Sequence, residues 1–211
     1  MIRILILGAP GAGKGTQSKL ISEALSIPHI STGDILRNEI SSGTPLGNKV
    51  KNYVESGQLV PDEIIADVLL SEISKEKYKS GYILDGFPRN INQVRIMENK
   101  GIIVDKVIFI DTSDDEIMKR ITGRRTCLNC GSVFNIYYNP PKEDNKCDKC
   151  GRELVQRKDD TEEVVRKRLD TFKSETLPVV EYYDNKKILF RVNGNKNFDD
   201  IKIEIFSLLG I

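Results

Sequence analysis

The feature that most constrains this chain is a glycine-rich stretch that directly follows a short apolar run. Ile4 to Leu7 is apolar, and the next residues read Gly8-Ala9-Pro10-Gly11-Ala12-Gly13-Lys14-Gly15-Thr16. A buried strand that stops at such a turn and restarts as a helix directs backbone N–H groups, a helix N-terminus and a lysine at one point. The spacing Gly8-x4-Gly13-Lys14 is that of a phosphate-binding P-loop, except that Gly15 stands where Ser or Thr usually follows the lysine. The stretch therefore predicts a nucleotide phosphate site, with an ordinary glycine-rich turn as the alternative.

Length and charge restrict the remaining classes of protein. The chain has 211 residues, the size of one α/β domain with insertions, and 39% of them are hydrophobic. It has 32 basic and 31 acidic residues, so no overall field attracts nucleic acid or an anionic membrane. No apolar run approaches the roughly 20 residues of a membrane span, and the start of the chain leaves no room for a signal peptide. We therefore expect a cytoplasmic protein without nucleic-acid or membrane partners. We also expect it to be a monomer.

Apolar runs alternate with helical periodicity along the chain. Strands are expected at Ile4–Leu7, Gly81–Asp85, Val104–Ile110 and Ile188–Val192, and the alternation from Ser132 to Tyr138 indicates a further hairpin strand. Helices are expected at Lys14–Leu25, from Ser31 to about Ile40, at about Leu46–Ser56, from Pro61 to Ile73, up to Met97, at Asp114–Ile121, from Asp160 through Phe172, and from Phe198 to Leu209. This alternation predicts an α/β fold of the P-loop NTPase type, a parallel sheet of about five strands flanked by helices. Residues 31–60 have little strand character and are expected to form a small helical insertion.

Four cysteines form two tight pairs. Cys127 and Cys130 make one Cys-x2-Cys knuckle, and Cys147 and Cys150 make another after 16 intervening residues. Four thiolates at this spacing can close a tetrahedral Zn²⁺ site, and a site with four protein ligands is structural because it has no open position for substrate. A redox or disulfide role is the alternative. The segment around the knuckles is too poor in large aliphatic residues to build its own core, so we expect the metal to hold it together as a mobile module.

Charged side chains recur where the predicted elements end. Asp85 closes a short apolar strand and is a candidate to hold the water shell of a nucleotide's Mg²⁺, with a plain turn aspartate as the alternative. Arg168 shares a helical face with Val165 and Leu169, so we expect it to point inward and to need an anionic partner. The arginines at element edges are Arg37, Arg89, Arg120, Arg124, Arg157 and Arg168. Such a set suits phosphoryl transfer, in which charge is spread over phosphate oxygens, although each arginine alone is more typical of a solvated surface charge.

Five motifs together resemble the adenylate kinase family, in its long form with a zinc-bearing lid. They are Gly8-Ala9-Pro10-Gly11-Ala12-Gly13-Lys14-Gly15-Thr16, Ser31-Thr32-Gly33-Asp34, Asp85-Gly86-Phe87-Pro88-Arg89, Gly123-Arg124-Arg125 and Arg157-Lys158-Asp159-Asp160. Lys14-Gly15-Thr16 is that family's own form of the P-loop. The resemblance implies reversible transfer of the γ-phosphoryl group of MgATP to AMP, giving two ADP, with Mg²⁺ accompanying ATP and structural Zn²⁺ in the lid.

The resemblance also implies a division of the chain and a set of site residues. The core would comprise residues 1–30, 61–122 and 161–211, the AMP-binding domain residues 31–60, and the lid residues 123–160. ATP would be bound by Gly11, Ala12, Gly13, Lys14, Gly15, Thr16, Arg120, Arg124, Val133, Phe134 and Lys196. AMP would be bound by Thr32, Arg37, Gln58, Leu59, Val60, Gly86, Phe87, Pro88, Arg89, Gln93, Arg157 and Arg168, with Gln93 reading the adenine edge. The catalytic cations would be Lys14, Arg89, Arg124, Arg157 and Arg168, while Asp85 and Asp159 would orient the magnesium's waters or the lid.

Two other functions compete with this interpretation. One is the same reaction with another acceptor or donor, such as UMP or GTP, because few residues set the choice of base. The other is a P-loop NTPase, or a nucleic-acid-binding switch that uses the cysteine module for docking. The first alternative predicts preference for a pyrimidine acceptor. The second predicts nucleotide hydrolysis or RNA binding without any requirement for AMP.

Overall fold

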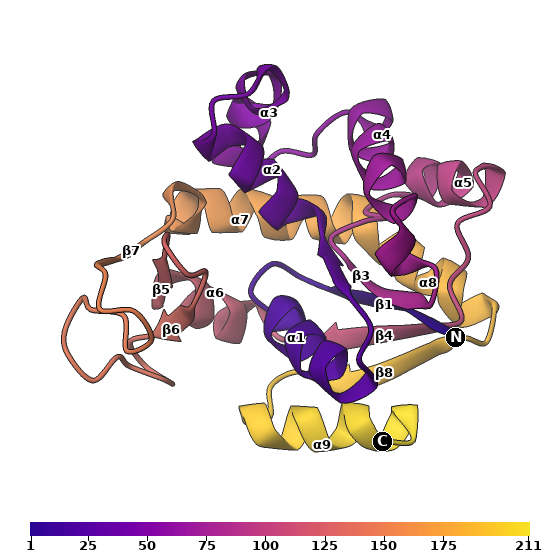
Figure 1. Ribbon diagram of the computed structural model, residues 1–211. Coiled ribbons are helices and arrows are strands. Elements are labelled where there is room, and N and C mark those ends of the chain that lie inside the picture. Colours follow the sequence, from indigo (N-terminus) through magenta and orange to yellow (C-terminus); the bar gives the residue numbers. More distant parts are fainter.

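The computed structural model describes residues 1–211 and is built on a five-stranded parallel sheet (Figure 1). The strands are β1 (Ile2–Gly8), β2 (His29–Ser31), β3 (Gly81–Asp85), β4 (Lys106–Asp111) and β8 (Leu189–Asn193), in the order β2-β3-β1-β4-β8. All neighbouring pairs run parallel. The predicted α/β fold with about five strands is therefore confirmed.

The two faces of this sheet carry alternate residues of each strand. In β1, Ile4 and Ile6 pack on one face with α1 (Lys14–Leu25) and α9 (Phe198–Leu209). Leu5 and Leu7 pack on the other face, which is covered by α4 (Asp62–Ile73), α5 (Ile91–Asn99) and α8 (Leu177–Asn185). Figure 1 shows these two helical layers on opposite sides of the sheet. Burial on both faces explains why the strands are continuous apolar runs without polar alternation.

Two helices between β2 and β3 stand apart from the layers that cover the sheet (Figure 1). They are α2 (Thr32–Ser41) and α3 (Pro45–Ser56). The Ser31 hydroxyl accepts a hydrogen bond from the backbone N–H of Asp34 at 3.2 Å and so caps α2 at the residue where a helix was expected to begin. Beyond α3, α4 follows directly, and a 3₁₀ turn (Glu76–Tyr78) leads into β3. Residues 31–60 thus form a helical segment, as their composition predicts.

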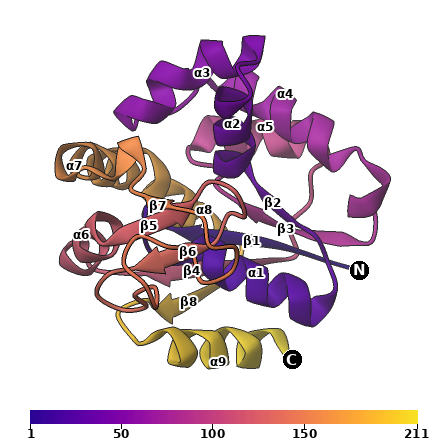
Figure 2. The ribbon, with the colours of Figure 1, turned by 60° about the vertical axis from the view of Figure 1, so that its left-hand side comes forward.

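A second, three-stranded antiparallel sheet follows α6 (Asp114–Thr122). Its strands are β5 (Arg124–Cys127), β6 (Val133–Asn135) and β7 (Leu154–Val155), in the order β6-β5-β7. Its small core consists of Cys127, Phe134, Cys147 and Leu154. Figure 2 brings this sheet and its long loops forward, beside the end of the main sheet. We call this segment, residues 123–160, the cysteine module.

Three local features differ from the predictions. Strands β2, β5 and β7 were not predicted, because each is only two to four residues long and exists through its pairing with a neighbouring strand. The helix expected to begin at Asp160 begins instead at Glu162, as α7 (Glu162–Thr171), while Asp160 lies in a 3₁₀ turn (Lys158–Asp160). Between α7 and α8 the backbone makes a π-helical turn (Phe172–Thr176), and α8, which has Pro178 in its first turn, was not predicted. No helix in the structure is both long and apolar enough to cross a bilayer.

Candidate functional site

The glycine-rich loop joins the end of β1 to the start of α1 at the carboxyl edge of the sheet. Helix α1 begins at Lys14, and its N-cap Gly13 has φ +96°, a left-handed conformation that favours glycine. The Lys14 ammonium donates hydrogen bonds to the carbonyl oxygens of Gly8 at 2.9 Å and Ala9 at 3.0 Å. A lysine and a helix N-terminus therefore meet at one loop, an arrangement that binds phosphate.

Asp85 ends the neighbouring strand β3 and lies beside this loop. It is 8% exposed, and its Oδ2 is 3.6 Å from the position of a Cβ built on Gly15. The Nε2 atom of His29 lies 3.7 Å from the same oxygen. A carboxylate at the edge of the loop is the oxygen donor that Mg²⁺ and its water shell prefer, so the residues present fit this ion.

Arginines from separate elements converge on Lys14. Burial and the nearby charges of Arg89, Arg168 and Arg124 together lower the pKa of Lys14 to about 8, against the opposing charge of Asp85. Arg89 follows β3, Arg124 lies on β5 of the cysteine module, and Arg168 lies on α7. Sequence-distant cations thus act on one ammonium group.

The same convergence affects the guanidinium groups themselves. Burial, together with the charges of Arg124 and Arg37, lowers the pKa of Arg157 to about 10. Burial also lowers the pKa of Arg168 to about 10, with Arg124 and Arg89 adding to it. Like charges that disfavour one another inside a partly buried site are stabilised by a bound anion of high charge.

Carboxylates on the hinge of the cysteine module hold two of these arginines. Arg168 Nη1 donates to Asp159 Oδ2 at 2.7 Å, which is the anionic partner expected for Arg168. Arg124 donates from Nε to Asp160 Oδ2 at 2.8 Å and from Nη2 to Asp160 Oδ1. Burial alone would lower the pKa of Arg124, but the ion pair with Asp160 outweighs burial and raises it. Both guanidinium groups are therefore fixed in direction at the point where module and sheet meet.

A pocket opens between α2, the end of α3 and the loop after β3. It is lined by Thr32, Gly33, Leu36, Arg37, Val54, Gly57, Gln58, Leu59, Val60, Ile65, Gly86, Arg89, Gln93, Asp159 and Arg168. The lining combines apolar side chains with three arginines, so it can hold an apolar ring and an anion together. It brings together most residues expected at an AMP site. Phe87 and Pro88 are instead buried, and Arg157 does not line the pocket.

The helical segment and the cysteine module also contact each other directly. Lys158 Nζ of the module lies 3.0 Å from Glu55 Oε1 of α3. A Cβ built on Gly57 would lie 2.7 Å from Cγ of Arg168, so the end of α3 packs closely against α7. The helical segment therefore contacts both the cysteine module and α7.

The remaining residues expected at an ATP site lie further along the sheet edge. Arg120 Nε donates to Glu116 Oε1 at 2.7 Å, and Arg120 Nη2 donates to the carbonyl oxygen of Lys196 at 3.4 Å. The Lys196 ammonium itself pairs with Glu204. Of the two expected module residues, Val133 is exposed and Phe134 is buried in the module's core. The structure brings Arg120 and Lys196 together, whereas the side chain of Phe134 packs beneath the cysteines.

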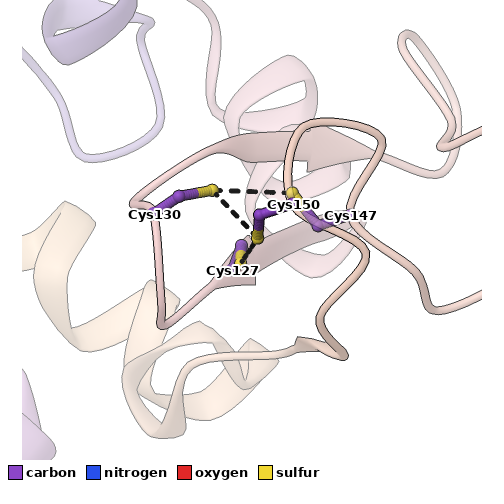
Figure 3. Close-up of side chains that lie close together, drawn as sticks. All are labelled: Cys127, Cys130, Cys147 and Cys150. Atoms are coloured by element: carbon purple, nitrogen blue, oxygen red, sulfur yellow. Dashed lines mark hydrogen bonds between the residues drawn. The ribbon is translucent and has the colours of Figure 1, made fainter.

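The four cysteines converge at the tip of the module (Figure 3). Their sulfurs lie 3.4 Å apart for Cys127 and Cys150, 3.6 Å for Cys130 and Cys147, and 3.5 Å for Cys130 and Cys150. Tetrahedral Zn²⁺ with bonds of about 2.3 Å requires sulfurs about 3.8 Å apart. A disulfide needs about 2.05 Å, and all four cysteines are free. The cluster therefore fits a four-thiolate metal site and carries no disulfide.

Sequence reasoning missed one polar residue at the pocket. Asp62, the first residue of α4, accepts a hydrogen bond from Gln93 Nε2 at 2.7 Å. The two residues are 31 positions apart, and no local motif links them. An acidic residue at a helix N-terminus is already explained by its favourable interaction with the helix dipole. The sequence therefore gave no sign that Asp62 also contacts Gln93.

Comparison with known proteins agrees with the geometry. The family model described as adenylate kinase matches residues 6–188. A protein named adenylate kinase from Caldicellulosiruptor bescii is 46% identical over 100% of both chains, and one from Thermodesulfovibrio yellowstonii is 46% identical over 99% of both. A third, from Archaeoglobus fulgidus, is 47% identical over 99% of this chain and 98% of its own.

Proposed function

This chain belongs to the adenylate kinase family and transfers a phosphoryl group reversibly from MgATP to AMP. From this premise we propose which residues bind each nucleotide and which stabilise the transferred group. The observation that carries the proposal is the convergence of Lys14 with Arg89, Arg124 and Arg168, whose charges lower the pKa of the lysine. Phosphoryl transfer needs positioning and charge stabilisation more than covalent chemistry. A cluster of cations from separate elements supplies both.

AMP binds in the pocket between α2, α3 and the loop after β3. Its base lies toward Leu36, Val60 and Gln93, and its phosphate lies toward Arg37 and Arg89. The other contributors are Thr32, Gln58, Leu59, Gly86, Phe87, Pro88, Arg157 and Arg168. Since the attacking group is a phosphate oxygen that is already ionised, the transfer needs no general base.

ATP binds with its phosphates on the glycine-rich loop from Gly11 to Thr16. Lys14 follows the group in transfer, and Arg124, Arg157 and Arg168 neutralise the charge of both phosphate chains. Arg120, Val133, Phe134 and Lys196 lie toward the rest of ATP. The Mg²⁺ that accompanies ATP neutralises phosphate charge when bound, and Asp85 holds its water shell.

The chain works as three parts. Residues 1–30, 61–122 and 161–211 form the core, residues 31–60 bind AMP, and residues 123–160 form the lid, which Zn²⁺ on the four cysteines holds together. Closure of the lid excludes water, which would otherwise accept the phosphoryl group. We expect a cytoplasmic monomer that acts on free nucleotides.

Replacement of single cations tests this assignment. We expect Lys14→Ala and Arg89→Ala to lower kcat on the order of 10³-fold, by the size of arginine contributions in related transfers. Arg166→Ala is the matched control, because Arg166 lies on α7 close to Arg168 but is exposed and pairs only with Glu162. Near-normal turnover of Lys14→Ala or Arg89→Ala, with the fold intact by circular dichroism, contradicts the assignment.

A further inference from the structure

The carboxylate of Asp62 receives three side-chain amides. Its Oδ1 accepts from Asn90 Nδ2 at 3.0 Å and from Gln93 Nε2 at 2.7 Å, and its Oδ2 accepts from Asn92 Nδ2 at 2.7 Å. Asp62 begins α4, whereas the three amides belong to the start of α5. One side chain therefore connects two helices at the wall of the pocket.

Both ends of the Gln93 amide are fixed. Gln93 is 2% exposed, its Oε1 accepts from the backbone N–H of Arg89 at 2.7 Å, and its Nε2 donates to Asp62. If the amide turned over, Oε1 would face the Asp62 carboxylate and the NH₂ group would face the Arg89 N–H. Both contacts would be repulsive, and the contact with the charged carboxylate would be the more unfavourable of the two, so together they hold the amide in one orientation.

This orientation leaves a defined pair of hydrogen-bonding positions. An amide oxygen has two lone pairs and an NH₂ group has two hydrogens, so Gln93 retains one acceptor and one donor. Gln93 lines the pocket beside Val60 and Leu36. The retained pair matches a ring edge that has an amino donor next to a ring-nitrogen acceptor, as adenine has at N6 and N1. A 6-oxopurine has the opposite order, with an acceptor at O6 and a donor at N1.

We propose that Asp62 is a positioning residue that locks the amide of Gln93 and so makes the acceptor site reject 6-oxopurine monophosphates. The inference rests on the proposed function, in which the base of AMP lies against Gln93. Asp62 acts through Gln93 and does not touch the nucleotide. Rejection works because a 6-oxopurine would need the amide reversed, and a reversed amide would oppose a carboxylate.

The charge of Asp62 supports this role. Burial alone would raise the pKa of Asp62, but the hydrogen bonds from Asn92, Gln93 and Asn90 outweigh burial and lower it. Asp62 is thus a charged acceptor at neutral pH, and a charged acceptor opposes a reversed amide more strongly than a neutral one.

The test compares AMP with inosine 5′-monophosphate, which differs from AMP only at the C6–N1 edge. Asp62→Asn keeps the shape of the side chain, but its own amide can accept either orientation of Gln93. We expect the ratio of kcat/KM for AMP to that for inosine monophosphate to fall on the order of 10- to 100-fold, with the KM for ATP unchanged. Glu63→Gln is the control, because Glu63 shares the first turn of α4 but is exposed. An unchanged ratio in Asp62→Asn overturns the proposal. If Asp62→Asn does not fold, the same ratio is measured in Asp62→Ser, where the same fall is expected.

A double replacement separates this proposal from the function on which it rests. If Asp62 acts through Gln93, adding Asp62→Asn to Gln93→Ala leaves the ratio where Gln93→Ala alone puts it. A further fall in the double variant overturns the positioning role. If Gln93→Ala alone leaves the use of AMP unchanged, the proposed AMP site is wrong. If Gln93→Ala lowers the ratio but Asp62→Asn does not, only the positioning role of Asp62 is wrong.

Discussion

The buried ion pair between Arg124 and Asp160 lets the account be tested through stability. Asp160 is fully buried, and it accepts from both Nε and Nη2 of Arg124 across the base of the cysteine module. Asp160→Asn keeps the shape of the side chain but leaves the Arg124 guanidinium without its counter-charge. The loss should therefore loosen the joint between β5 and the 3₁₀ turn that leads into α7.

The size of the effect follows from burial. Breaking a buried pair by removing one partner costs about 3–5 kcal/mol. The Arg124 side chain is 17% exposed, so water recovers part of this loss, and we expect about 2–4 kcal/mol of destabilisation. In a chain of this length 1 kcal/mol shifts Tm by about 2–4 °C, so Tm should fall by about 5–15 °C. Thermal unfolding followed by circular dichroism measures this shift.

An exposed ion pair on α7 provides the control. Lys167 Nζ lies 2.8 Å from Glu163 Oε1 on α7, but the two side chains are 60% and 80% exposed. Glu163→Gln should change stability by less than about 0.5 kcal/mol, because solvent screens such pairs. If Asp160→Asn and Glu163→Gln lower Tm equally, the reasoning from burial is refuted.

Two further outcomes follow from the lysine and the metal centre. The pKa of Lys14 is lowered to about 8, and a bound polyphosphate favours the charged form of the lysine. ATP should therefore bind with full affinity below pH 8 and more weakly as the pH rises above 8. Calorimetry from pH 7 to 9 checks this, and Lys14→Met should remove the dependence; equal affinity across the range contradicts it. Cys147→Ser, or chelation of the metal, should lower Tm and kcat while the helical signal of the core persists; metal content that bears no relation to Tm opposes a structural role.

Local patterns predicted the main sheet because its strands are buried on both faces. The apolar runs around Ile4, Ile83 and Ile108 follow directly from that burial. Strands β2 and β7 could not be predicted this way. His29–Ser31 is mostly polar in sequence and becomes a strand only by pairing with β3, and Leu154–Val155 does so by pairing with β5. Pairing between distant segments leaves no periodicity in either one.

The residues of the candidate site also fall into those that local patterns predicted and those that they did not. The glycine-rich loop and the two cysteine knuckles were predictable, since each is a contiguous motif with a fixed chemistry. The inward direction of Arg168 was also predictable from its helical face, and Asp159 is its partner. By contrast, Asp160 was expected to cap a helix, and its carboxylate instead holds Arg124. The contact of Asp62 with Gln93 likewise depends on two helices meeting, which no local pattern encodes.

The central claim is that the converged cations transfer a phosphoryl group between two nucleotides and not to water. The direct measurement is ADP formation from MgATP by the purified protein, with and without AMP, in a coupled assay. We predict that ADP forms only when AMP is present, with two ADP for each AMP consumed, and that ADP alone is converted to ATP and AMP. ADP formation from MgATP at the same rate without AMP would contradict the account.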